Sequence, residues 1–232
     1  MTPVLTVDDL QLEVRWSTRR KTLQLTVDRG GELLVYAPKG TERTVLEDFV
    51  RNNKTWLYTK LATKELLQSD APAREMRTGE GFHYLGRTYR LQLVRSQDRP
   101  LKLTHGRFRL RRDAKAEGRA HFERWYTEHA LPWLTRRVGM YEDRMAVKPA
   151  GVEVRDLGNR WGSCGARGVL NFHWATILLP PSVIEYVVVH ELAHLHEQHH
   201  TPAFWQRVAR AMPDYESRKT WLAENGAGFV GL

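Results

Sequence analysis

The stretch His190-Glu191-Leu192-Ala193-His194, with His200 six residues beyond it, decides which fold the sequence predicts. In a helix, residues four apart differ by only about 40° around the axis, so His190 and His194 share one face. Two imidazoles placed in this way can hold one zinc ion. Glu191 can then reach a water molecule at the metal and act as a general base. Because this pentapeptide also occurs by chance, its flanking residues have to support the interpretation.

Both flanks predict helices. The apolar run over residues 183–189 is long enough for a buried helix, and Ser182 and Glu185 stand at the spacing of a capping box at its start. After the motif, Thr201 is a good N-cap and Pro202 suits the first position of a second helix. The sequence therefore predicts a helix-turn-helix unit around the histidines.

His200 lies at the predicted turn, from which its side chain can reach back to supply a third ligand. His199 is its rival. Glu197 is a weaker candidate, because a continuing helix would place it about 10 Å along the axis from His190. The spacing of the three histidines also matches metzincins, but those proteins carry a glycine where Glu197 stands, which favours the helix-turn-helix unit.

Composition limits the class of protein. The chain has 232 residues with 41% hydrophobic residues, enough for one large core or two modest ones. The sequence contains no run of about 18 apolar residues, so no membrane span is expected, and residues 1–12 lack the pattern of a signal peptide. Cys164 is the single cysteine, so no internal disulfide can form, and a cytoplasmic location is expected.

The formal net charge of +9 has two interpretations. A basic, soluble surface is the simpler one. The other is a polyanionic partner, either a nucleotide or a nucleic acid contacted through its backbone phosphates. The basic residues are scattered along the chain, and the sequence contains no P-loop, zinc finger or DNA-binding helix-turn-helix motif.

The remaining pattern predicts an α+β fold. We expect an antiparallel β-rich N-terminal region with one long helix over residues 1–112, and the metal-binding domain over residues 113–232. The expected elements are an antiparallel pair of strands over 10–16 and 23–27, a strand over 33–36, a helix from Thr41 to about Leu61, hairpins around Gly86 and His105-Gly106, a helix over 114–145 with a break or kink at Pro132, a strand over 152–154, a polar loop over 158–164, a strand over 168–179, and a last helix over 215–225.

Several motifs together resemble one family. They are Asn159-Arg160-Trp161-Gly162-Ser163-Cys164, Leu170-Asn171, Leu179-Pro180-Pro181, the segment 186–195 with its two histidines, and His200-Thr201-Pro202-Ala203-Phe204-Trp205. In these motifs the sequence resembles the YgjP-like metallopeptidases, relatives of the SprT-like zincins, and the likeness extends into the N-terminal half.

The resemblance implies His190, His194 and His200 as zinc ligands, Glu191 as the catalytic base and a protein or peptide as substrate. It also implies a zincin-like unit of the minimal gluzincin type, in which a small sheet lies beside the motif helix and its edge strand can receive an extended peptide. Some members of the family are linked instead to nucleoside triphosphate pyrophosphatase activity. A third alternative, suggested by the SprT-like relatives, is a DNA-associated protease that uses a basic surface.

Other residues are candidates for substrate contact. Arg160 and Ser163 could line the cleft, with Arg160 pairing a carboxylate or a phosphate. The alternative is a structural loop pinned by Trp161 in the core. Tyr186 and Tyr215 are candidate donors to a developing oxyanion, although spacing cannot place them.

Overall fold

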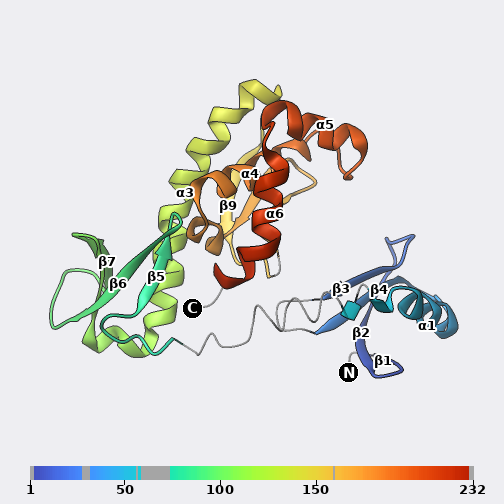
Figure 1. The fold of residues 1–232 in the computed structure, drawn as a ribbon, viewed down its shortest axis with the longest axis horizontal. Helices are drawn as coiled ribbons and strands as arrows, with labels where there is room; N and C mark the ends of the chain where they lie inside the picture. Colours follow the sequence, from blue (N-terminus) through green and yellow to red (C-terminus); the bar gives the residue numbers. More distant parts are fainter. Residues whose placement is uncertain (1–2, 28–31, 56, 59–73, 159, 230–232) are drawn as a thin grey trace. The chain divides into compact units, whose positions relative to one another are not determined.

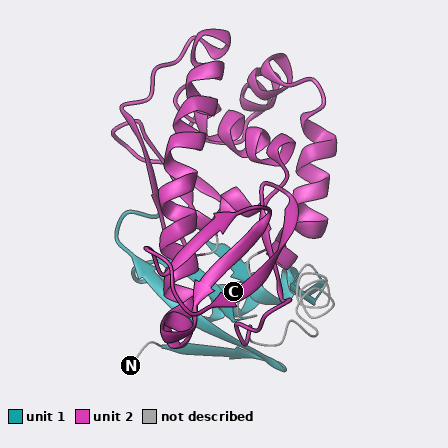
Figure 2. Cartoon of the chain, turned by 90° about the vertical axis from the view of Figure 1, so that its left-hand side faces the viewer, with its two compact units in different colours: residues 1–70 teal, residues 71–232 magenta. Residues whose placement is uncertain are grey.

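The computed structural model describes residues 3–27, 32–55, 57–58, 74–158 and 160–229. The chain forms two compact units, residues 1–70 and residues 71–232, which Figure 2 colours separately. Each unit has its own cluster of buried apolar side chains. In the described part of the chain, no helix combines the length and the apolar character that crossing a membrane requires.

The described residues of the first unit contain a four-stranded sheet and helix α1. Its strands are β1 (Val4–Val7), β2 (Leu10–Ser17), β3 (Gln24–Val27) and β4 (Leu33–Pro38), in the spatial order β1-β2-β4-β3, followed by α1 (Arg43–Asn52). The expected pairing of the strands over 10–16 and 23–27 is wrong, because β4 lies between them, parallel to β2 and antiparallel to β3. The helix predicted from Thr41 to about Leu61 corresponds to α1, and residues 56 and 59–61 of that prediction lie outside the described residues.

The second unit begins with two hairpins, which confirms the prediction around Gly86 and His105-Gly106. They are β5 (Gly81–Tyr84) with β6 (Arg87–Val94), and β7 (Leu101–Thr104) with β8 (Arg107–Arg111). Parallel pairing of β6 with β8 joins them into one sheet. The sequence pattern places this sheet in the N-terminal region, but it packs on the following helix, where the Phe82 and Phe122 ring centroids lie 4.0 Å apart. The two compact units therefore divide between residues 70 and 71, not at the expected position between 112 and 113.

A long helix, α3 (Gly118–Met145), follows the short 3-10 turn η1 (Arg112–Glu117) and runs along the second unit (Figure 1). Of the break or kink expected at Pro132, the break is wrong, since the helix continues through this residue. Pro132 removes only one backbone donor, while Ala130 and Leu134 on either side of it are fully buried. Packing of the buried face outweighs the missing hydrogen bond.

A second sheet has the order β10-β11-β9. It contains β9 (Gly151–Arg155), β10 (Gly162–Cys164) and β11 (Val169–His173), with β11 antiparallel to β10 and parallel to β9. The predicted loop over 158–164 therefore ends in an edge strand. The strand predicted over 168–179 stops at His173, where the 3-10 turn η2 (Trp174–Leu178) begins.

Three helices complete the unit, namely α4 (Pro181–Ala193), α5 (Pro202–Ala211) and α6 (Tyr215–Asn225), followed by the 3-10 turn η3 (Gly226–Phe229). Thr201 caps α5 as predicted, because its hydroxyl oxygen accepts a hydrogen bond from the Phe204 amide at 3.3 Å. The capping box at Ser182 is wrong: α4 already begins at Pro181, and its N-cap, Pro180, makes no side-chain cap.

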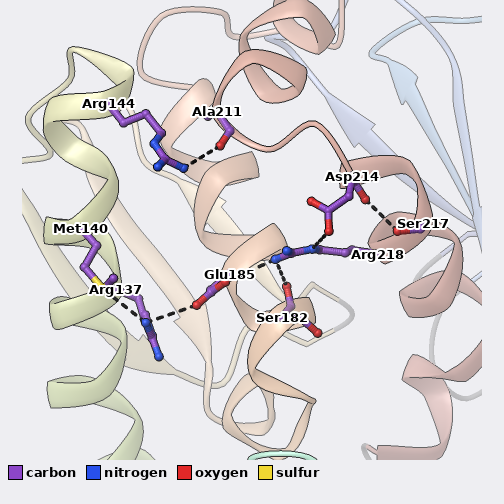
Figure 3. Close-up of polar contacts among 9 residues, drawn as sticks. All are labelled: Arg137, Met140, Arg144, Ser182, Glu185, Ala211, Asp214, Ser217 and Arg218. Atoms are coloured by element: carbon purple, nitrogen blue, oxygen red, sulfur yellow. Dashed lines mark hydrogen bonds and ion pairs between the residues drawn. The ribbon is translucent and has the colours of Figure 1, made fainter.

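Helix α4 is held from several sides. In the β5–β6 turn, the Leu85 and Gly86 amides donate to the Ile177 and Leu178 carbonyls at 2.9 and 3.0 Å, just before α4 begins. Gly86 has a φ of +73°, and a Cβ there would lie 2.8 Å from the Pro180 Cα, so the contact requires glycine. Side-chain contacts to α3 and α6 hold the middle of α4 (Figure 3).

Candidate metal centre

Three histidines converge at the end of α4. His190 lies in its last turn, His194 directly follows its last residue, and His200 immediately precedes the Thr201 cap of α5. One nitrogen from each ring lies within 4.8 Å of the other two. The Nε2 atoms of His190 and His200 are 2.9 Å apart, and the three ring centroids are separated by 4.8–5.0 Å.

Hydrogen bonding and burial hold the rings in a form that can bind a metal. The Glu197 carbonyl oxygen lies 2.9 Å from Nδ1 of His194 and can only accept, so Nδ1 donates and the Nε2 lone pair stays free. Burial lowers the pKa of His190 to about 3, with smaller effects from the charges of His194, His200 and Lys219. Partial burial likewise lowers the pKa of His200. A neutral imidazole is the form that coordinates a metal.

The donor set fits a zinc ion. Tetrahedral zinc with Zn–N bonds of about 2.0–2.1 Å requires ligand nitrogens about 3.4 Å apart. The separations found, from 2.9 Å to at most 4.8 Å, bracket this value, so shifts of about 1 Å bring all three nitrogens into place. Three imidazoles leave a fourth position for a water molecule or a substrate atom, which is typical of catalytic zinc sites.

Glu191 lies beside this cluster and is only 6% exposed. Its Oε2 atom is buried with no hydrogen-bond partner among the described residues. Burial raises the pKa of Glu191 to about 8, although the Arg160 charge and a hydrogen bond from the Cys164 amide both act to lower it. The buried carboxyl group thus keeps one oxygen atom without a partner among the described residues, available to accept a proton.

Strand β10 packs directly on the Glu191 side chain. A Cβ atom on Gly162 would lie 2.7 Å from Cγ and 2.8 Å from Oε1 of Glu191. Such a distance is well inside van der Waals contact, so only glycine allows this approach. The sequence showed Gly162 in a motif but gave no sign of this contact, which depends on tertiary packing.

Aromatic rings surround the histidines. The Phe204 ring is fully buried, with its centroid 4.7 Å from those of both His194 and His200. The Trp205 ring stacks on His200 with 5.6 Å between centroids. Because both residues lie in the first turn of α5, their packing fixes the backbone that carries His200.

The alternative ligands lie outside this group. His199 is exposed and has no place in the three-nitrogen cluster. The Glu197 carboxylate lies 3.7 Å from Arg207 and pairs with that cation. The backbone carbonyl of Glu197, in contrast, orients the His194 ring. His196 contacts the Met145 carbonyl of α3 at 3.3 Å.

The loop before β10 serves a structural role through Trp161. The Trp161 carbonyl accepts hydrogen bonds from the His173 amide and the Thr176 hydroxyl, both at 2.9 Å. Arg160 is exposed, and its charge acts on Glu191. Ser163 is half-buried in β10, opposite Asn171 of β11. The structure thus brings Arg160 near the centre and anchors the neighbouring tryptophan.

The two tyrosines differ in availability. Tyr186 is buried with its ring centroid 5.9 Å from that of His190, and burial raises its pKa to about 12. The Tyr215 hydroxyl donates to the Glu216 carboxylate at 3.2 Å, while its ring stacks on Trp205. Lys219, which sequence reasoning missed, places Nζ 4.1 Å from the centroid of the same tryptophan ring. No local signal in the sequence points to this contact, because Trp205 and Lys219 lie on different helices.

Comparison with known proteins identifies the class. A family model described as "YgjP-like, metallopeptidase domain" matches residues 21–225, so the chain is a metallopeptidase, a metal-dependent hydrolase of proteins or peptides. Within that class, the chain belongs to the YgjP-like family, which confirms the resemblance seen in its motifs.

The crystal structure of the metallopeptidase zymogen of Pyrococcus abyssi abylysin is similar to this chain, with 19% sequence identity and a TM-score of 0.36. The match covers 39% of this chain and 93% of that chain. A comparison with curated proteins gives no match.

Proposed function

We propose that this chain is a zinc-dependent metallopeptidase in which His190, His194 and His200 hold the metal and Glu191 is the general base. The observation that carries the proposal is the convergence of three imidazole nitrogens within 4.8 Å beside a buried carboxyl group. Zinc in this position supplies Lewis-acid chemistry, lowering the pKa of a coordinated water molecule toward about 7 and polarising the substrate carbonyl.

Glu191 transfers the proton. Its Oε2 atom, which has no hydrogen-bond partner among the described residues, accepts a proton from the attacking water and returns it to the leaving amine. The contacts from Gly162 and the Cys164 amide hold the carboxyl group in place. Strand β10, at the edge of its sheet, can align an extended peptide through its backbone groups.

The substitution Glu191→Gln tests this role. It should leave one zinc per chain while lowering the turnover of an unfolded-protein substrate by about 10²–10⁴-fold, the usual contribution of a general base. Glu128→Gln, at an exposed position of α3, is the matched control and should keep full activity. A fully active Glu191→Gln protein would exclude the mechanism.

Two alternative functions can be distinguished from the proposed one by substrate or by DNA binding. A metal-dependent nucleoside triphosphate pyrophosphatase would use Arg160 to clamp phosphates. A DNA-associated protease would require affinity for DNA at low salt. Incubation with an unfolded protein and with a panel of nucleoside triphosphates, each with and without chelator, separates the first alternative. A salt series with duplex DNA tests the second. Cleavage of protein alone, without DNA affinity, is the result we expect.

A further inference from the structure

An aromatic and cationic surface adjoins the third histidine. It consists of Trp205 on α5 with Tyr215 and Lys219 on α6. The Trp205 ring stacks on both the His200 and the Tyr215 rings, with centroid distances of 5.6 and 5.5 Å. The Lys219 ammonium lies 4.1 Å from the Trp205 centroid. A single ring therefore separates this exposed cation from the candidate metal centre.

The acidic groups close to Lys219 in sequence and on the neighbouring helix have other partners. Asp214 and Glu185 pair with Arg218 at 2.9 and 3.3 Å (Figure 3). Glu216 accepts the Tyr215 hydroxyl. Within the part of the chain that the structure describes, Lys219 makes no ion pair, and its contact with Trp205 leaves the three N–H donors of the ammonium group available.

A second cation lies toward the Glu191 side of the centre. Arg160 precedes the strand β10 that packs on Glu191, and its charge acts on that carboxyl group. It too forms no ion pair with the residues that the structure describes. The centre thus has a cation near the His200 end and another near the Glu191 end. Both favour a negatively charged group on whatever binds between them.

We propose that Lys219, Trp205 and Tyr215 form a carboxylate-binding subsite, so that the preferred peptides carry a negative charge near the cleaved bond. This inference rests on the proposed peptidase function and names the substrate class of the same site. The carboxylate accepts hydrogen bonds from the ammonium group, and the chain that carries it packs on the two rings. An Asp or Glu side chain and a free C-terminus share this chemistry.

A peptide series tests the subsite. One sequence is made with Glu, Gln or Lys at each position flanking the cleaved bond, and with a free or an amidated C-terminus. For wild type, kcat/KM should be about three- to tenfold higher for the matching acidic peptide than for its Gln or amidated counterpart, mainly because KM is lower. This factor is the range expected for an exposed charge-assisted contact. A preference at an internal position indicates a side-chain carboxylate, and a preference for the free acid indicates the C-terminus.

Variants of Lys219 give the matched controls. Lys219→Met keeps the stem on Trp205 but removes the charge, so the preference should disappear, whereas Lys219→Arg should keep it. Lys219→Glu should reverse the preference toward the lysine peptide. Lys115→Met changes the net charge equally, at an exposed position in η1 before the start of α3, and should leave the preference intact.

Binding separates this inference from the proposed function. Calorimetry measures the affinity of the acidic peptide and its amide for wild type and for Lys219→Met, without any turnover. Tighter binding of the acidic peptide to wild type alone supports the subsite even if no peptide is cleaved, in which case the peptidase proposal fails by itself. Equal affinity of both peptides for wild type overturns the subsite, whatever the activity.

Discussion

Gly162 has no side chain at the point where one would collide with the candidate base. A Cβ atom there would lie 2.7 Å from Glu191 Cγ, inside a strand that pairs with β11 and has little freedom to retreat. The flexible end of Glu191 is therefore the part that would move. Because proton transfer requires the carboxyl group within hydrogen-bond reach, its position is under tight constraint.

Gly162→Ala should therefore separate metal binding from turnover. We expect unchanged zinc content and a loss of about a hundredfold in kcat, the cost of a displacement of about 1 Å in a catalytic group. Gly151→Ala, in strand β9 of the same sheet, is the control, since a Cβ there meets nothing within 4 Å. Equal activity of the two variants would show that the contact does not constrain Glu191.

The third ligand can be tested by comparing neighbouring histidines. His200→Ala should lower the zinc content well below one per chain, because the Nε2 atom 2.9 Å from that of His190 is lost. His199→Ala should retain stoichiometric zinc, since His199 lies outside the cluster. Metal analysis after dialysis measures both. Retention of zinc by His200→Ala together with its loss from His199→Ala would exchange the two assignments.

At the scale of single residues, the sequence predicted those neighbours in the candidate site that local spacing along the chain determines. A helical pentapeptide places His190 beside His194, and the Thr201-Pro202 start of α5 places His200 next to them. Gly162 and Lys219 could not be found in this way. Their significance depends on which distant residues pack against them, and a single sequence does not contain that information.

Helix α4 carries the metal motif between two other helices, and ion pairs link all three. Glu185 of α4 lies 3.3 Å from Arg137 of α3 and 3.3 Å from Arg218 of α6 (Figure 3). Arg218 also donates to the Ser182 carbonyl at 2.9 Å. The Glu185 side chain is only 20% exposed, so solvent screens these pairs less than it screens a surface pair.

Glu185→Gln should destabilise the second unit by about 1–2 kcal/mol, between the values for exposed and for buried pairs. The amide keeps the shape but leaves Arg137 without its carboxylate. Denaturant unfolding of the metal-free protein measures the change. Glu128→Gln, exposed on α3, should change the stability by less than about 0.5 kcal/mol. Indistinguishable midpoints for the two variants would mean that the pairs contribute nothing.

At the scale of elements, the sequence did not predict which strands pair with each other. Alternating residues located β2 and β3, and a short connection favoured pairing them as a hairpin. The parallel partner of β2 is instead β4, which comes later in the sequence. Local pattern also overestimated the tendency of Pro132 to break the helix, because the burial of Ala130 and Leu134 depends on the sheets and helices around α3. In both cases tertiary packing decided against the local preference.

In the described part of the whole molecule, the buried apolar side chains form two clusters. One is built from β1, β2, β4 and α1, and the other extends from Met76 to Met212. The second core includes Val189 and Leu192 of α4, which flank His190 and Glu191 in the sequence, and Phe204 of α5. Folding of the metal centre therefore depends on contacts within residues 71–232.

A fragment of residues 71–232 should therefore fold and bind zinc without the first unit. It should unfold cooperatively, and zinc at 100 times its dissociation constant should add about 2.7 kcal/mol of stability that a chelator removes. Cleavage of a short peptide should persist, because all residues of the proposed mechanism lie in the fragment. The same zinc-dependent shift in the full-length chain provides the reference. A fragment that folds but binds no zinc would show that the first unit takes part in forming the centre, and would assign to residues 1–70 a role that their separate core does not predict.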